Sequence, residues 1–108
     1  MADLLNTENH TDDELSTTEK LLVETARIAW HELQRFFAQG AVLMVDVSLD
    51  LVNVAVFIAE DDSQSLQPLI DKGLVRAPDN DIARAWYAKN TELWCVVVAP
   101  YVLVQDKA

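Results

Sequence analysis

An apolar run of twelve residues at Leu93–Val104, LWCVVVAPYVLV, constrains the fold of this chain most strongly. The run is too short for a membrane-spanning helix, which needs about 20 residues. Its valine and aromatic content is typical of a buried β-strand. Pro100 has no N–H to donate to a neighbouring strand, so the run predicts a strand that ends, bulges or lies at a sheet edge there. We expect the half before Pro100 to be interior and the half after it to lie near an edge or interface.

The chain is long enough for one domain with a modest core. It has 108 residues, of which 51% are hydrophobic, so it needs no disulfide bonds to fold. Cys95 is its single cysteine, which excludes an internal disulfide framework. Because Cys95 lies within the apolar run, we expect a buried thiol that acts as a small hydrophobic side chain.

The negative charge is distributed unevenly along the chain. The formal net charge is −10, and residues 1–16 carry five acidic side chains but no lysine or arginine. A nucleic-acid-binding protein usually presents a basic surface, so direct binding to nucleic acid is not expected, nor is binding to an anionic membrane surface. An acidic surface that mimics nucleic acid stays open as an alternative.

The first residues do not have the pattern of a secretory signal. They lack a basic start, an apolar stretch and a small-residue cleavage site, and no other segment is long enough for a membrane helix. We therefore expect a cytoplasmic protein. Residues 1–15 read as an acidic, disordered leader, and residues 16–106 as a single α+β domain.

A long helix is predicted from Thr17 to Ala38. Ser16 followed by Glu19 matches a capping box, and Gly40 suits a left-handed cap at the other end. One polar stripe recurs at helical spacing: Lys20, Glu24, Arg27, His31 and Arg35. Most of the remaining surface of such a helix is apolar. It would therefore be central to the fold or covered by a second subunit.

The next segment is ambiguous. Residues 41–47 predict a strand, and residues 48–50 a turn. In residues 51–59, alternating β-branched side chains favour a strand, whereas polar residues at helical spacing favour a helix capped by Ser48. We favour the strand, in an antiparallel hairpin with residues 41–47.

The later segments alternate between short helices and strands. We expect a helix from Ser65 to Lys72 with Pro68 in its first turn, a short strand at residues 74–77, and a helix from Asp79 to Lys89. Asn90 suits the end of that last helix. The predicted fold class is α+β: a long N-terminal helix, a β-hairpin, two short helices and a C-terminal strand in a small mixed sheet.

Few residues indicate a catalytic, metal-binding or cofactor-binding site. Asp46 within a predicted strand, Glu32 beside the apolar arc and His31 on the first helix are weak catalytic candidates. A solvent-facing aspartate that shapes a turn and an exposed helix histidine are the more common roles of such residues. The acidic residues 60–62 lack the alternating ligands and the glycine of a calcium loop. With only two glycines, the chain has no phosphate-binding loop, and we predict neither a metal nor a cofactor.

Four segments together resemble a known family. They are ETARIAWHELQRFFAQG (24–40), VDVSLDLVNVAVFIAEDD (45–62), an Ala–Trp helix at 83–86, and LWCVVVAPYVLVQ (93–105). This combination resembles the small bacterial proteins grouped as domain of unknown function 2288, over residues 19–105. The family pattern has proline where this chain has Ala29, and tryptophan where it has Tyr101. The resemblance implies a cytoplasmic bacterial protein and no established activity or catalytic residue.

Three functional hypotheses follow. The preferred one is a non-enzymatic, self-associating interaction domain, a homodimer with Trp30, Phe37, Tyr101 and Leu103 as interface candidates, because its apolar surface exceeds what a small monomer needs. An unidentified protein partner would use the same surface. The second is a ligand-binding protein or enzyme that uses Asp46, Glu32 and His31 around Trp30. The third is an acidic nucleic-acid mimic.

Overall fold

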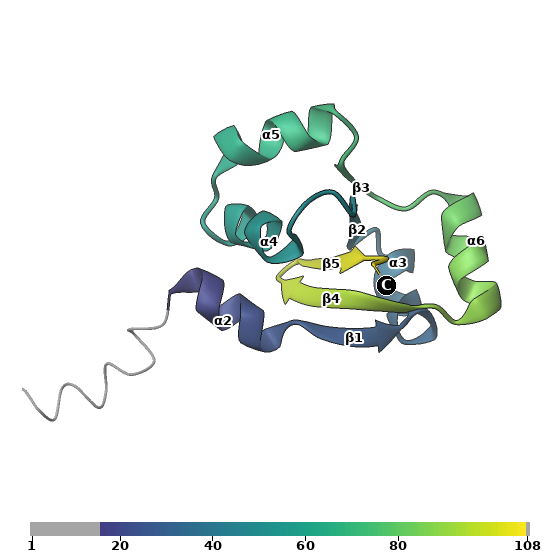
Figure 1. The fold of residues 1–108 in the computed structure, drawn as a ribbon. Coiled ribbons are helices and arrows are strands. Elements are labelled where there is room, and N and C mark those ends of the chain that lie inside the picture. The colour runs from purple at the N-terminus through teal and green to yellow at the C-terminus, as the bar shows by residue number, and fades with distance from the viewer. Residues whose placement is uncertain (1–15, 108) are drawn as a thin grey trace, which may run out of the picture.

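The computed structural model describes residues 16–107, which build a mixed five-stranded sheet with helices on both faces (Figure 1). The strands are β1 (Ala26–Ala29), β2 (Val42–Val45), β3 (Val75–Arg76), β4 (Glu92–Val98) and β5 (Tyr101–Gln105). Their order in the sheet is β1-β4-β5-β2-β3. β2 and β5 are parallel, and the other neighbours are antiparallel. The predicted α+β class is confirmed, whereas the predicted leader, residues 1–15, lies outside the described residues.

Different helices cover the two faces of the sheet. They are α2 (Thr17–Glu24), the 3-10 helix η1 (Trp30–Leu33), α3 (Gln34–Ala38), α4 (Leu51–Ala59), α5 (Ser63–Asp71) and α6 (Asn80–Lys89). One buried cluster joins α2 and α4 to the face of the sheet that carries Val96 and Leu103. A second cluster joins η1 and α6 to the face that carries Leu93, Val102 and Val104. The sheet is therefore the middle layer of the fold.

The predicted long helix from Thr17 to Ala38 is wrong, because the chain leaves the helix at Thr25. The capping box is present, with Ser16 Oγ accepting from the N–H of Glu19 at 3.0 Å. Thr25 is extended (φ −75°, ψ 130°), and β1 follows it. β4 offers these residues a strand partner, with Ala26 opposite Cys95. The wide apolar arc is thereby divided among α2, β1, η1 and α3, and the predicted polar stripe does not form.

The end of α3 was predicted correctly from Gly40. Gly40 has a positive φ of 74°, which glycine adopts without steric penalty. Its N–H donates to the carbonyl of Phe37 at 3.0 Å, and the N–H of Ala41 donates to that of Phe36 at 2.9 Å. These two bonds satisfy carbonyls that the helix end leaves without partners.

The strand favoured for residues 51–59 is wrong, because this segment forms α4. Asp50 caps the helix in place of the expected Ser48, since its Oδ1 accepts from the N–H groups of Val52 and Asn53 at 2.9 and 3.3 Å. α4 packs against α2, α5 and the sheet, which buries it on several sides. Alternating valines thus reflect a helix buried over much of its surface. The predicted hairpin with residues 41–47 is also wrong, as β2 pairs with β5 and β3.

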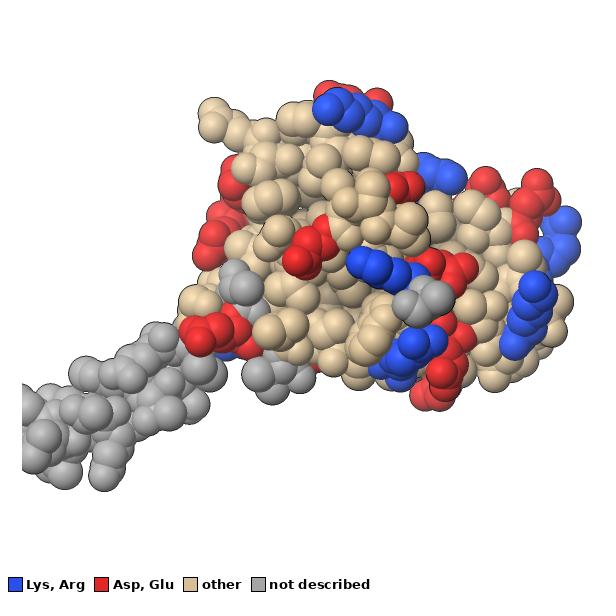
Figure 2. Space-filling model, in the orientation of Figure 1, with Lys and Arg blue, Asp and Glu red and all other residues tan. Residues whose placement is uncertain are grey.

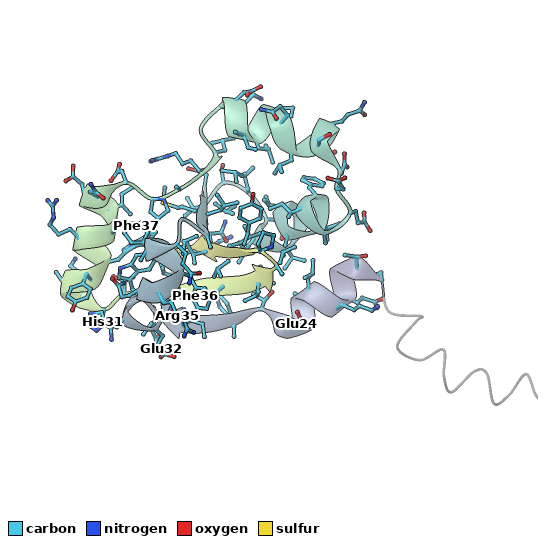
Figure 3. All side chains as sticks on the ribbon, turned by 180° about the vertical axis from the view of Figure 1, so that it is seen from behind. Glu24, His31, Glu32, Arg35, Phe36 and Phe37 are labelled. Carbon is cyan, nitrogen blue, oxygen red and sulfur yellow. The ribbon has the colours of Figure 1, made fainter. Side chains whose placement is uncertain are left out.

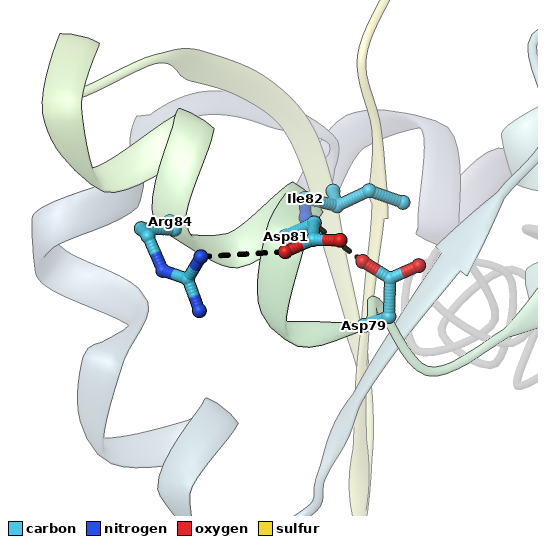
Figure 4. Close-up of polar contacts among 4 residues, drawn as sticks. All are labelled: Asp79, Asp81, Ile82 and Arg84. Carbon is cyan, nitrogen blue, oxygen red and sulfur yellow. Dashed lines mark hydrogen bonds and ion pairs between the residues drawn. The ribbon is translucent and has the colours of Figure 1, made fainter.

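The next two helices lie close to their predicted positions. α5 begins two residues before the predicted Ser65, because Asp62 caps it, so Pro68 lies inside the helix and not in its first turn. α6 begins after Asp79, whose Oδ1 accepts from the N–H of Ile82 at 2.8 Å (Figure 4). Figure 4 also shows Arg84 against Asp81 one turn away, at 3.3 Å. Asn90 adopts the expected left-handed conformation at the end of α6.

The C-terminal apolar run forms a hairpin of β4 and β5 around Ala99 and Pro100. Pro100 lies in the turn, where its missing N–H interrupts no ladder. The half after Pro100 was expected near an edge, and this is wrong, since β5 is the central strand of the sheet. Both of its faces are covered: Leu103 belongs to one core cluster, and Val102 and Val104 to the other.

Candidate functional site

His31 closes the end of α6. Its Nε2 lies 2.9 Å from the carbonyl oxygen of Tyr87, and its backbone N–H donates to Asn90 Oδ1 at 2.9 Å. The His31 and Tyr87 rings lie 4.4 Å apart, centroid to centroid. The side chain and backbone of His31 therefore join η1 to the last turn of α6, which is a structural role.

Asp46 and Glu32, the other two catalytic candidates, lie away from the contact between His31 and α6. Asp46 Oδ2 accepts from the backbone N–H and the hydroxyl of Ser48, at 2.9 and 2.6 Å, and these bonds hold the pKa of its carboxyl below the ordinary value. Glu32 projects from η1 and is separate from His31, which lies against α6 (Figure 3). Of the three cavities described below, one includes Glu32, and none includes His31 or Asp46. The structure does not gather the three around Trp30, which is fully buried.

The four interface candidates differ in how much of their surface is exposed. Trp30 and Leu103 have no exposed surface, because they lie in the two core clusters. Phe37 is half-buried, with its ring centroid 5.4 Å from that of Trp30. Tyr101 is exposed and lines an apolar groove of about 290 Å³ beside α4 and α5. A surface of this fold can draw on Tyr101 and in part on Phe37, but not on Trp30 or Leu103.

A second apolar groove, here called the sheet groove, lies on the opposite face of the sheet and has a volume of about 270 Å³. It is lined by Glu24, Ala26, Ile28, Glu32, Leu33, Phe36, Cys95, Val97 and Val102. η1 and α3 supply one wall, and the strands supply the floor. Cys95 is buried there, which raises the pKa of its thiol to about 11. Val97, by contrast, is 56% exposed, because it lies near the end of β4, beyond the residues that pair with β1.

Charged side chains of both signs flank the sheet groove. Glu24 lies at its α2 end, and Arg35 lies beside Phe36 toward the other end (Figure 3). The guanidinium carbon of Arg35 is 5.0 Å from the centre of the Phe36 ring. The groove thus has an apolar middle, an acidic side chain at its α2 end, and both Glu32 and Arg35 near the other end.

The largest of the three cavities, here called the loop cavity, lies on the α4 face of the sheet and measures about 520 Å³. It is lined by Thr25, residues 47–52, Trp94, Gln105 and Lys107. Gln105 is 4% exposed, and its Nε2 donates to the carbonyls of Asp46 and Leu49 at 2.9 and 2.8 Å. The sequence offers one signal for this residue, a polar side chain directly after the apolar run.

The face seen in Figure 2 carries both acidic and basic side chains, with uncharged surface between them. Arg27, for example, pairs with Glu92 at 3.6 Å. Within residues 16–107, no three His, Cys, Asp or Glu side chains are grouped so that they could hold a metal ion. No helix in this part of the chain is long and apolar enough to cross a membrane.

Comparison with known proteins agrees with this fold. The family model "Protein of unknown function (DUF2288)" matches residues 16–106. The chain belongs to the DUF2288 family. A solved structure similar to this DUF2288 chain is the NMR solution structure of PA1075 from Pseudomonas aeruginosa, with 44% sequence identity and a TM-score of 0.75. The likeness covers 92% of this chain and 93% of that one. No match was found among curated proteins.

Proposed function

We propose that this protein is a non-enzymatic interaction domain of the cytoplasm that forms a symmetric dimer through the sheet groove. The observation that supports this most is the exposure of Val97, 56% of its surface, in the lining of an apolar groove. Contiguous exposed apolar surface commonly marks an interaction site. The neighbouring Ala26 and Phe36 extend this apolar surface on either side.

The charges at the two ends of the groove allow a second copy of this chain as the occupant. Glu24 lies toward one end, and Arg35 and Glu32 lie toward the other (Figure 3). A twofold axis through the groove brings the Glu24 end of each copy against the Glu32 and Arg35 end of the other, and Arg35 supplies the favourable contact with Glu24. Because a stable interface buries about 800 Å² on each partner, the contact must also take in parts of α2 and α3.

The test is sedimentation of the full chain at tens of micromolar. We expect a dimer, and we expect Val97→Asp to sediment as a monomer, because it places a charge in the apolar centre of the interface. Val47→Asp is the matched control: Val47 is 53% exposed and lies outside the sheet groove, so this variant should remain dimeric.

A charge exchange tests the twofold arrangement. Glu24→Arg and Arg35→Glu should each weaken the dimer, because each places like charges together, and the double variant should restore it. A wild-type chain that sediments as a monomer overturns the proposal, and so does a dimer that Val97→Asp leaves intact. Sedimentation as a complex with an added protein but never with itself would assign the groove to another partner.

A further inference from the structure

The loop cavity has features of a small-molecule site, and it lies on the opposite face of the sheet from the proposed dimer interface. Its volume of about 520 Å³ falls within the range of about 300–1,000 Å³ that is typical of ligand pockets. Its walls combine the aromatic ring of Trp94, the buried amide of Gln105 and the charged side chain of Lys107. This inference is therefore independent of self-association.

The amide oxygen of Gln105 is the first observation that points to a ligand. Both amide hydrogens are used, because Nε2 donates to the carbonyls of Asp46 and Leu49. Within residues 16–107, Oε1 accepts no hydrogen bond, yet it is not among the fully enclosed polar atoms without a partner. Gln105 lines the loop cavity, which places its amide at the cavity wall. Oε1 therefore offers a fixed acceptor to water or to a donor on a ligand.

Trp94 supplies an aromatic surface next to that acceptor. Trp94 and Gln105 are directly opposed on β4 and β5, so their side chains are neighbours on one face of the sheet. The guanidinium carbon of Arg27 lies 5.3 Å from the centre of the Trp94 ring and restricts its position. An aromatic wall beside one acceptor suits a flat ring that carries an N–H donor at its edge.

The charged groups of the cavity differ in their availability. Asp50 already accepts two N–H groups of α4, whereas Lys107 takes part in no ion pair described for residues 16–107. Lys107 is therefore the cation that can attract an anionic substituent of a ligand.

We propose that the loop cavity binds a planar, amino-substituted heterocycle of the adenine type. Its exocyclic N–H donates to Gln105 Oε1, its ring packs on Trp94, and Lys107 attracts an anionic substituent such as a phosphate.

Adenosine and purine riboside form a matched pair of probes, because purine riboside lacks only the exocyclic amino group. In titrations of the isotope-labelled full chain, adenosine should shift the amide signals of Trp94 and Gln105. Purine riboside should bind roughly fivefold more weakly, the factor expected for the loss of one hydrogen bond. Adenosine 5′-monophosphate should bind more tightly than adenosine, and Lys107→Gln should remove that difference.

Two variants complete the test. Trp94→Leu should abolish binding of adenosine, whereas Ile70→Thr should leave it unchanged, because Ile70 is exposed on α5 and lines neither the loop cavity nor the sheet groove. The comparison of the two nucleosides uses the unmodified chain, so it decides the question even if Trp94→Leu fails to fold. Absence of shifts at about 5 mM adenosine, where even a millimolar ligand is largely bound, overturns the proposal. Equal binding of the two nucleosides overturns it as well.

Discussion

Gln105 Nε2 lies 2.9 Å from the backbone oxygen of Asp46, although the two residues are 59 positions apart in the chain. The same nitrogen donates to Leu49 at 2.8 Å. One side chain at the end of the central strand thus fixes the loop that leads from β2 into α4. That loop also contains Asp50, so the start of α4 depends on the position of β5.

Replacement of Gln105 by leucine should lower the free energy of unfolding by about 2–3 kcal/mol, because two loop carbonyls lose their donor in a buried setting. Equilibrium unfolding in urea measures the change. Gln67→Leu is the control, since the exposed amide of Gln67 bonds only the neighbouring Asp71. If the two variants lose equal stability, Gln105 does not have the role assigned to it.

Asp50→Ala should lower the free energy of unfolding by about 1 kcal/mol, the usual effect of removing a helix cap. Ser48→Ala should have a smaller effect, because the Ser48 hydroxyl bonds the exposed Asp46 and not the helix. Thermal and urea unfolding of the two variants separate these outcomes. A larger loss from Ser48→Ala would mean that Ser48 caps α4.

Cys95 should resist alkylation in the folded protein. Burial raises the pKa of its thiol from 9.0 to about 11, so little reactive thiolate is present near pH 8. Iodoacetamide should label the chain much faster in urea than in buffer, as mass spectrometry would show. Equal labelling rates would mean that the floor of the sheet groove is open.

The same thiol makes stability depend on alkaline pH. Between pH 9.0 and about 11 the unfolded chain loses the Cys95 proton while the folded chain keeps it. The free energy of unfolding should therefore be unaffected by this group below pH 9.0 and should fall as the pH rises above it. Cys95→Ala should remove this part of the slope; an unchanged slope would assign it to other groups.

Glu19 should titrate below its ordinary value of 4.5, because the backbone N–H and then the hydroxyl of Ser16 stabilise its carboxylate. A lowered pKa in the folded state gives stability above the unfolded pKa, and this is lost as the pH falls through the folded pKa. Carboxyl NMR titration should place the Glu19 pKa below 4.5, and Ser16→Ala should raise it. No rise in the variant would mean that the Ser16 hydroxyl does not stabilise the Glu19 carboxylate.

Sequence patterns predicted best those features that depend on neighbours in the chain. The capping box at Ser16 and Glu19, the left-handed Gly40 and the caps of α6 each need only a few consecutive residues. The apolar run also predicted the β core, because such a run must be buried. A break near Pro100 followed from proline chemistry alone.

The errors lie where distant residues decide the outcome. Residues 26–29 have a helical pattern but become a strand, because β4 offers them a partner. Residues 51–59 have a strand pattern but become a helix, because Asp50 caps them and α2, α5 and the sheet cover them. Gln105 was missed for the same reason, since its bonding partners lie far away in the chain.

The central position of β5 has a consequence for how the protein is made. A ribosome releases β1 and β2 long before β4 and β5, so the first strands emerge without the neighbours that complete their hydrogen bonds. The two sides of the sheet meet only through β5. The newly made chain must therefore wait for β5 before the sheet can close, which places folding after the release of Gln105.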